Sequence, residues 1–216
     1  MDKELMHKQQ KILGHLCILL PLLSVGFGLI GYFTGVNNPG WYESISATFY
    51  ANSKMMMIGL LCATSIYFWA YKGYDKADDI ITKIGAITAL MIVAFPCSDG
   101  KATTEPIVGL FCLPLGVSGA IHNISALVLY TSFIVQTFRF TKHGKVMTDM
   151  KKKRNIFYYC CIGVMLFGTL FIFSCNIIDP LKPYHFFILI GESFLQLGYG
   201  CAWLCKSEAF KCLNDK

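Results

Sequence analysis

The segment "PYHFFILIGESFLQLGYG", residues 183–200, places a carboxylate in the middle of an apolar run. Glu192 follows His185 by two helical turns, and most residues around the two are apolar or aromatic. A carboxylate near the centre of a membrane helix costs about 2.5–3.5 kcal/mol on insertion scales, so it usually faces a bundle interior, a cavity or a pathway. We therefore expect Glu192 to point inward.

The composition of the whole chain is typical of a membrane protein. Of its 216 residues, 55% are hydrophobic and 15% are charged, whereas an average soluble domain has roughly 25% charged residues. The apolar residues form six blocks, each long enough to cross a hydrocarbon core of about 30 Å. These blocks predict an all-α fold, a single-domain bundle of six transmembrane helices over residues 1–216. The predicted spans are Ile12–Phe33, Met55–Tyr71, Ile80–Pro96, Gly116–Phe138, Asn155–Cys175 and Tyr184–Cys205.

Two regions depart from this simple pattern. The third span contains Lys83, whose long side chain can reach the interface. Upstream of the fourth span, "PIVGLFCLPL" (Pro106–Leu115) is about ten residues long and too short to cross, and Pro114 separates it from the span. It is either a re-entrant or interfacial hairpin, or the start of a long kinked helix.

Basic residues predict the orientation of the bundle. With the N-terminus in the cytoplasm, every Lys and Arg except Lys54, Lys101 and Lys182 falls on the cytoplasmic side. The positive-inside rule therefore places both termini in the cytoplasm. This asymmetry also explains the net charge of +6 without a nucleic-acid partner. We expect the "KKKRN" run at residues 151–155 to anchor the topology or to contact anionic lipid headgroups.

Several short motifs have ordinary structural explanations. "GFGLIG" matches a dinucleotide-binding fingerprint by letters, but no strand precedes it, so we expect no nucleotide and instead close helix packing through Gly28, Gly31 and Gly35. The cysteines lack metal-binding spacing, although Cys97 and Cys112 could form a disulfide on an oxidising face. We expect Asp75 to cap the third helix rather than to bind metal.

Two polar stripes point to one candidate site. Glu192 lies about 12 Å below the outer surface and His122 about 9 Å, if both helices rise about 1.5 Å per residue. A direct His122–Glu192 pair is the simplest way to satisfy both groups. The stripe on the last helix consists of His185, Glu192, Gln196, Tyr199 and Trp203; that on the fourth consists of Ser118, His122, Ser125, Ser132 and Gln136.

The outer loops are expected to add a polar mouth above this pair. Glu43 and Ser46 lie in the first outer loop, and Asp99 opens the second. Together these groups predict an outward-facing polar cavity.

Three kinds of function fit this arrangement. The pair could fix helix packing or form part of a ligand or lipid site, it could relay protons or a solute, or it could belong to a metal-dependent hydrolase that acts on lipid. Whether the chain is an enzyme stays open at this level, and no metal-ligand set is defined.

Five segments, spread over nearly the whole chain, carry a resemblance to a known family. They are "SISATFY", "YKGYDKADD", "AFP", "HNISA" and "GESFLQLGYGCAWLCKSE". In this order they resemble a family of uncharacterised bacterial multi-pass membrane proteins. The resemblance implies a six-helix bundle in a bacterial inner membrane and brings no established activity. A more distant likeness to the ceramidase and progestin-receptor group of metallohydrolases rests on a His, an Asp and a Ser near one membrane face, but the last helix here offers His185 and Glu192 in place of that group's His pair.

Overall fold

Each of the six apolar blocks forms one α-helix in the computed structural model, which describes residues 3–37, 42–97, 107–144, 146–177 and 186–214. The predicted all-α class is therefore confirmed. Four of the described helices, α1, α4, α5 and α6, are long and apolar enough to cross a membrane. The helices are α1 (Lys3–Phe33), α2 (Lys54–Ala70), α3 (Lys76–Ala94), α4 (Leu115–Lys142), α5 (Asp149–Ile177) and α6 (Phe186–Lys206).

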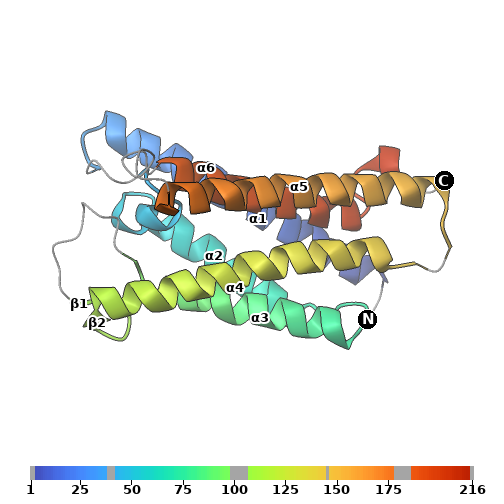
Figure 1. The fold of residues 1–216 in the computed structure, drawn as a ribbon, viewed down its shortest axis with the longest axis horizontal. Helices are drawn as coiled ribbons and strands as arrows, with labels where there is room; N and C mark the ends of the chain where they lie inside the picture. The colour runs from blue at the N-terminus through green and yellow to red at the C-terminus, as the bar shows by residue number, and fades with distance from the viewer. Residues whose placement is uncertain (1–2, 38–41, 98–106, 145, 178–185, 215–216) are drawn as a thin grey trace.

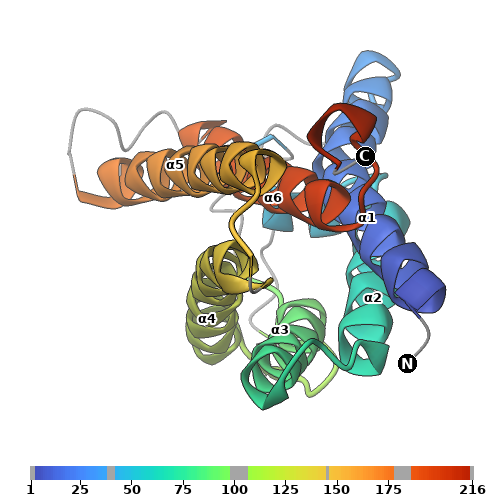
Figure 2. The same ribbon diagram turned by 90° about the vertical axis from the view of Figure 1, so that its right-hand side faces the viewer.

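Consecutive helices lie side by side, and α6 packs back against α1 (Figure 2). Helix α6 also contacts α4, so it has neighbours on three sides. The beginning of α1 and the short helix η3 (Lys211–Leu213) lie at the same end of the bundle, which we call the termini end (Figure 1). The opposite end carries the 3-10 helix η1 (Ser46–Tyr50) and a small β-hairpin, and we call it the hairpin end.

The hairpin lies between α3 and α4. Strands β1 (Ile107–Val108) and β2 (Leu113–Pro114) pair antiparallel, with Ile107 opposite Pro114. Its turn is held against α3, because Leu110 N donates to Ala94 O and the Phe111 ring stacks on Phe95. Of the two predictions for this segment, the hairpin shape is thus confirmed for residues 107–114 and the long kinked helix is wrong, while the re-entrant or interfacial position stays a prediction.

The core between the two ends is filled by aromatic side chains. Phe133 of α4 stacks on Tyr199 of α6 with ring centroids 3.8 Å apart. The Trp203 ring makes edge-on contacts with the rings of Tyr71 and Phe140. Offset and edge-on contacts of this kind add to the free energy of burial. The members of this aromatic cluster, all at most 2% exposed, are Phe68, Tyr71, Phe133, Phe140, Tyr199 and Trp203.

Glycines bring α6 close to its neighbours. A Cβ on Gly191 would lie 2.5 Å from the carbonyl oxygen of Gly168 in α5, and one on Gly200 would lie 2.8 Å from that of Gly14 in α1. Small residues allow this approach of helix backbones. The sequence predicted close helix packing at other glycines, Gly28, Gly31 and Gly35. The prediction is wrong for Gly35, which lies beyond the end of α1.

The glycines near the end of α1 contribute to the turn that follows the helix. Gly28 accepts a hydrogen bond from the Asn37 side chain, and Gly31 packs against Asn37 and Asn52. Gly35 lies beyond the end of the helix and has φ +72°. This left-handed conformation prevents the chain from continuing as a helix. The sequence spacing is the same as in helix-packing motifs, but here it serves to turn the chain after α1.

The outer surfaces of the helices are apolar. Large hydrophobic side chains stand exposed along α5, among them Leu166, Phe167 and Leu170. An apolar surface of this extent is unusual for a soluble monomer and is expected of a lipid-facing bundle. No disulfide joins Cys97 to Cys112 in this structure.

Candidate functional site

His122 of α4 lies at the hairpin end, where it contacts the start of η1. Its Nε2 lies 2.9 Å from the Ser46 hydroxyl, and its Nδ1 lies 2.9 Å from the carbonyl oxygen of Phe95. A carbonyl oxygen can only accept, so Nδ1 carries the hydrogen in the neutral ring and Ser46 donates to Nε2. His122 is 3% exposed. Both ring nitrogens therefore have partners within the protein.

Glu192 of α6 contacts the same segment from the other side. Its Oε2 accepts from Ile45 N at 2.6 Å, and the Ser46 N–H and the Tyr130 hydroxyl also hydrogen-bond its carboxyl group. The first N–H groups of a helix have no partners within the helix. Ile45, the residue before η1, provides no capping side chain of its own. Glu192 therefore caps η1 from a helix 147 residues further along the chain.

No hydrogen bond or ion pair joins His122 to Glu192 in the described structure, so the predicted direct pair is wrong. The two side chains are linked instead through the Ile45–Ser46 segment, which lies between them. The prediction considered only partners on helices. It placed the first outer loop above the pair and not between its two side chains, because a short irregular segment leaves no periodic pattern that would show where its backbone lies.

The other predicted residues of the buried cluster have separate partners. Ser125 is 5% exposed and donates to Ile121 O in its own helix. Gln196 is 3% exposed and hydrogen-bonds the Tyr130 hydroxyl, which in turn reaches Glu192. Gln196 thus belongs with Glu192, whereas Ser125 is satisfied locally. His185 lies outside the described residues.

Two residues of the predicted outer mouth, Glu43 and Ser46, are buried or half-buried against the helices. Glu43 is 7% exposed, and its carbonyl oxygen accepts from Leu189 N in the first turn of α6. Ser46 is half-buried because it meets His122. Asp99 lies outside the described residues. We call Ile45, Ser46, Phe95, His122 and Glu192 the polar junction. It joins four of the sequence segments that carry the family resemblance.

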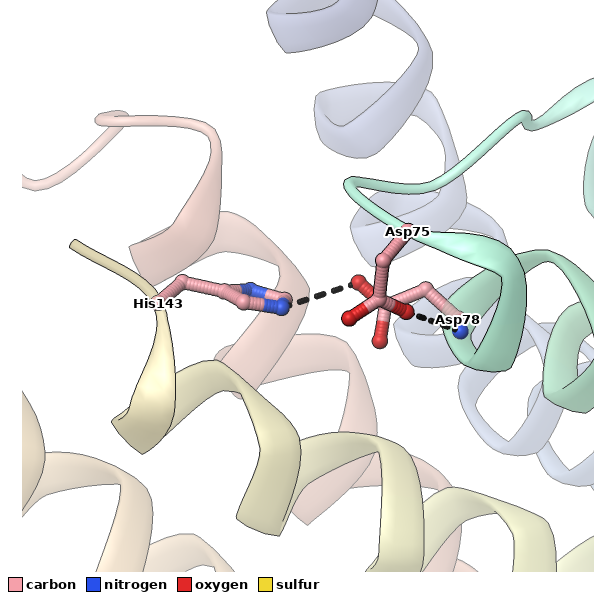
Figure 3. A group of neighbouring side chains, drawn as sticks. All are labelled: Asp75, Asp78 and His143. Carbon is pink, nitrogen blue, oxygen red and sulfur yellow. Dashed lines mark hydrogen bonds and ion pairs between the residues drawn. The ribbon is translucent and has the colours of Figure 1, made fainter.

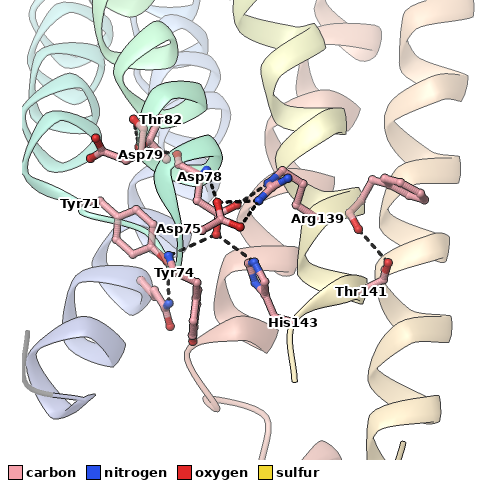
Figure 4. A network of polar contacts seen from close by, with 11 residues as sticks. Tyr71, Tyr74, Asp75, Asp78, Asp79, Thr82, Arg139, Thr141 and His143 are labelled. Atoms are coloured by element: carbon pink, nitrogen blue, oxygen red, sulfur yellow. Dashed lines mark hydrogen bonds and ion pairs between the residues drawn. The ribbon is translucent and has the colours of Figure 1, made fainter. Parts of the chain in front are cut away.

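A second polar site, which we call the ion-pair network, occupies the termini end. Asp75 caps α3, because its Oδ1 accepts from Asp78 N at 2.9 Å, so the predicted capping role is confirmed. Asp78 is fully buried and pairs with Arg139 of α4 and with His143, whose Nε2 lies 3.0 Å from Asp78 Oδ2 (Figure 3). Arg139 also binds both carboxylate oxygens of Asp75, at 2.7 and 2.6 Å (Figure 4).

The network keeps both carboxyl groups ionised. The N–H of Asp78 and the Arg139 guanidinium lower the pKa of Asp75. Burial would raise the pKa of Asp78, but the close contact with His143 and the hydrogen bond from Arg139 outweigh burial, and the pKa falls below its usual value. A buried carboxylate needs such partners because its desolvation costs several kcal/mol.

Asp75, Asp78 and His143 also bring three potential metal ligands within 4.8 Å of one another. Arg139 already contacts both carboxylate oxygens of Asp75 and Oδ1 of Asp78, and Oδ2 of Asp78 faces His143, so a cation would have to displace the guanidinium. The geometry is that of an ion-pair network. Sequence reasoning missed Arg139 and His143 because both looked like ordinary basic residues at a helix end.

The fold and these two sites describe an all-α bundle with candidate membrane-spanning helices and a cluster of polar contacts at each end. No family model, no curated protein and no solved structure matches the chain. Its relation to the uncharacterised bacterial family stays a prediction.

Proposed function

We propose that this chain is a six-helix integral membrane protein with a structural or ligand-binding role. Helices α2 and α3 complete the six. At about 1.5 Å per residue, the 17 residues of α2 and the 19 of α3 approach the roughly 30 Å thickness of a hydrocarbon core. Both present apolar side chains outward, including Ile66, Trp69, Ile87 and Leu90. Their outer surfaces therefore suit lipid as those of α5 do.

The distribution of basic residues supports a cytoplasmic termini end. Lys72, Arg139, Lys142 and the 151–154 run all lie near that end, whereas Lys54, the first residue of α2, lies at the hairpin end. By the positive-inside rule both termini face the cytoplasm. The family resemblance suggests a bacterial inner membrane.

The observation that carries the structural role is the clamping of Ile45 and Ser46 between two helices. His122 of α4 and Glu192 of α6 direct their hydrogen bonds to this segment. A buried carboxylate with several hydrogen-bond donors is held firmly and in turn fixes the groups that donate to it. The junction thus holds the 42–50 loop in one conformation, as a rigid outward-facing surface that a lipid or another ligand can meet.

The same geometry is less suited to the hydrolase alternative. Both ring nitrogens of His122 are engaged by Ser46 and Phe95, so the ring has no lone pair directed at an open metal position. A wide solute path is also disfavoured, because the aromatic cluster fills the core between the two polar ends.

A proton pathway is the second candidate, and one observation favours it. Gln136 of α4 is fully buried, and neither its amide nitrogen nor its amide oxygen has a hydrogen-bond partner among the described residues. An unsatisfied buried amide costs about 1–3 kcal/mol, and internal water is its usual partner. Gln136 lies on α4 between His122 and Arg139, so such water would sit between the polar junction and the ion-pair network.

Glu192→Ala and Glu192→Gln distinguish these functions. Glu192→Ala removes the cap of η1 and should lower stability by about 1.5–3 kcal/mol, the range for hydrogen bonds to charged groups. Glu192→Gln keeps one acceptor oxygen and should lower stability less. Thermal unfolding of the purified protein measures both changes. Ser193→Ala is the matched control, since the Ser193 hydroxyl donates to Leu189 O in its own helix.

Proton flux in liposomes separates the two candidates. The structural role predicts that the two Glu192 variants change stability and leave proton permeability at the level of the unsubstituted protein. A flux that depends on the protein and disappears with Glu192→Gln would instead establish the pathway. Stoichiometric zinc that is lost with His122→Ala would overturn both in favour of the hydrolase.

A further inference from the structure

A pocket of about 130 Å³ lies at the termini end, where α1, α4, α5 and α6 meet. Its walls carry far more positive than negative charge. Lys151 and Arg154 of α5 and Lys206 of α6 line it, and Glu208 is the one acidic residue among the lining residues described. Glu208 already lies 3.8 Å from both Lys3 and His7 at the rim. The pocket and the polar junction therefore lie at opposite ends of the bundle, because the pocket is at the termini end and the junction at the hairpin end. A ligand in the pocket does not depend on the function proposed for the junction.

Two lysines of the lining are withdrawn from solvent, since Lys151 is buried and Lys206 is half-buried. Lys151 is 8% exposed, and its Nζ donates to Gly144 O. Lys206 lies over the Tyr74 ring, 4.3 Å from the ring centroid, and over the Phe140 ring at 5.5 Å. In the described residues neither lysine forms an ion pair. Asp78, a buried acid at the same end of the bundle, is engaged by Arg139 and His143. Buried positive charges without a counter-charge are costly.

The position of the basic run within α5 adds to this imbalance. Residues 151–154 lie in the first two turns of a helix whose N-terminus carries partial positive charge, where basic side chains are unfavourable. The side chains of this run also lie on two different faces of α5. Lys151 and Arg154, three residues apart and so on one face, line the pocket, whereas Lys152 and Lys153 are exposed. An anion in the pocket would compensate both the lysines and the helix terminus.

We propose that this pocket binds a phosphate group. At about 30 Å³ per water molecule, its volume corresponds to about four waters, which suits a phosphate but not a whole lipid. A phosphate offers several acceptor oxygens to cations that approach from different helices. The side chains of Asn155, Tyr74 and Tyr158, also in the lining, add neutral donors. The phosphate comes from an anionic lipid headgroup or from a soluble phosphate. Basic pockets between membrane helices on the cytoplasmic side bind such headgroups.

Two double variants with equal charge change test the site. Lys151→Gln with Lys206→Gln removes two cations that line the pocket, and Lys152→Gln with Lys153→Gln removes two exposed cations beside them. The full chain is purified in neutral detergent. Binding is then measured from the shift of the thermal midpoint as phosphatidic acid, phosphatidylcholine or inorganic phosphate is added. The pocket variant should bind phosphatidic acid about tenfold or more weakly, because each charge-assisted bond is worth more than the 1.4 kcal/mol that corresponds to tenfold. The exposed pair should change binding by less than about twofold.

The ligand series identifies the source of the phosphate. Saturable stabilisation by phosphatidic acid, with inorganic phosphate far weaker, assigns a lipid headgroup; equal stabilisation by both assigns a soluble phosphate. Without ligand, the pocket variant should be at least as stable as the unsubstituted protein, because charge repulsion is relieved. If that double variant does not fold, Lys206→Gln alone should still weaken binding severalfold. Equal weakening by the pocket and exposed pairs, or no saturable binding of either phosphate source, would overturn the proposal.

Discussion

Asp78 shows how much one residue can depend on its neighbours. Its carboxylate is fully buried at the start of α3, and it is stable there because Arg139 and His143 approach it from α4 and from the loop that follows α4. The network therefore ties α3 to α4 at the termini end. Removing the Arg139 cation leaves the buried carboxylate with His143 as its one remaining ionisable partner among the described residues, and the cost of losing one partner of a buried pair exceeds the net contribution of the pair.

Arg139→Met should consequently lower stability by about 3 kcal/mol. The same change at Lys83 is a matched control, because Lys83 pairs with Asp79 one turn earlier in the same helix and both side chains are partly exposed. Lys83→Met should cost less than about 0.5 kcal/mol. Thermal or denaturant unfolding of the purified variants measures both. Similar losses for the two would mean that Asp78 does not need Arg139.

The pKa of Asp78 also predicts how stability depends on pH. Because the pKa is lower in the folded protein than the usual value of about 3.9, the carboxylate stabilises the fold at pH values above about 4. This contribution is lost as the pH falls through the lowered pKa. Asp78→Asn should therefore be less stable than the unsubstituted protein near neutral pH, and the difference should shrink below about pH 4. A difference that stays constant from neutral to acidic pH would contradict this assignment.

At the scale of the elements, α6 owes its central place to small residues on two faces. Gly191 meets Gly168 of α5, and Gly200 meets Gly14 of α1. Gly191→Ala places its Cβ 2.5 Å from Gly168 O and 2.7 Å from the Ile172 side chain, so it should cost about 1–3 kcal/mol by overpacking. Gly163→Ala in α5 is the control, since among the described residues no side chain and no atom of another helix lies within 4 Å of the added Cβ, and alanine favours the helix. Thermal unfolding should show a loss for the first and none for the second; equal effects would show that the α5–α6 contact is not tight.

Helix positions could be predicted well, because an apolar run long enough to cross a membrane leaves few alternatives to a helix. The ends were less predictable. Helix α1 begins at Lys3, nine residues before its apolar block, because the polar turns of residues 3–11 continue the helix beyond that block. The docking of η1 on Glu192 could not be predicted, since it joins groups 147 residues apart through the backbone of a loop. The stripes correctly identified His122 and Glu192 as buried, and only their partners were wrong.

For the whole molecule, the structure separates two polar regions by an aromatic core. The polar junction and the ion-pair network lie at opposite ends, and the aromatic cluster, which includes Phe133, Tyr199 and Trp203, lies between them. This arrangement gives each end of the bundle its own chemistry. The hairpin end holds a loop in place, and the termini end gathers basic side chains around a pocket. The predicted orientation assigns the first to the outside and the second to the cytoplasm.

Two exposed native cysteines provide a direct test of that orientation. Cys112 lies in the hairpin, and Cys212 lies in η3 at the opposite end. In spheroplasts, a membrane-impermeant maleimide should label Cys112, and it should label Cys212 only after the membrane is opened. Cys112→Ser and Cys212→Ser assign each signal to its residue. The reverse pattern would invert the orientation, and labelling of both in intact spheroplasts would rule out an odd number of crossings between them.

A third position decides between six spans and four. Lys72 is exposed in the loop between α2 and α3, so in a chain that also has Cys112→Ser and Cys212→Ser, Lys72→Cys reports the side on which that loop lies. If α2 and α3 both cross, this position should be protected in intact spheroplasts, because the loop shares the cytoplasmic side with Cys212. If neither crosses, the loop stays on the side of the hairpin and is labelled as readily as Cys112. Protection would thus show that α3 spans the membrane although it carries Asp78, Asp79 and Lys83. These charges are compatible with a crossing because all three lie near the start of α3 and each is in an ion pair.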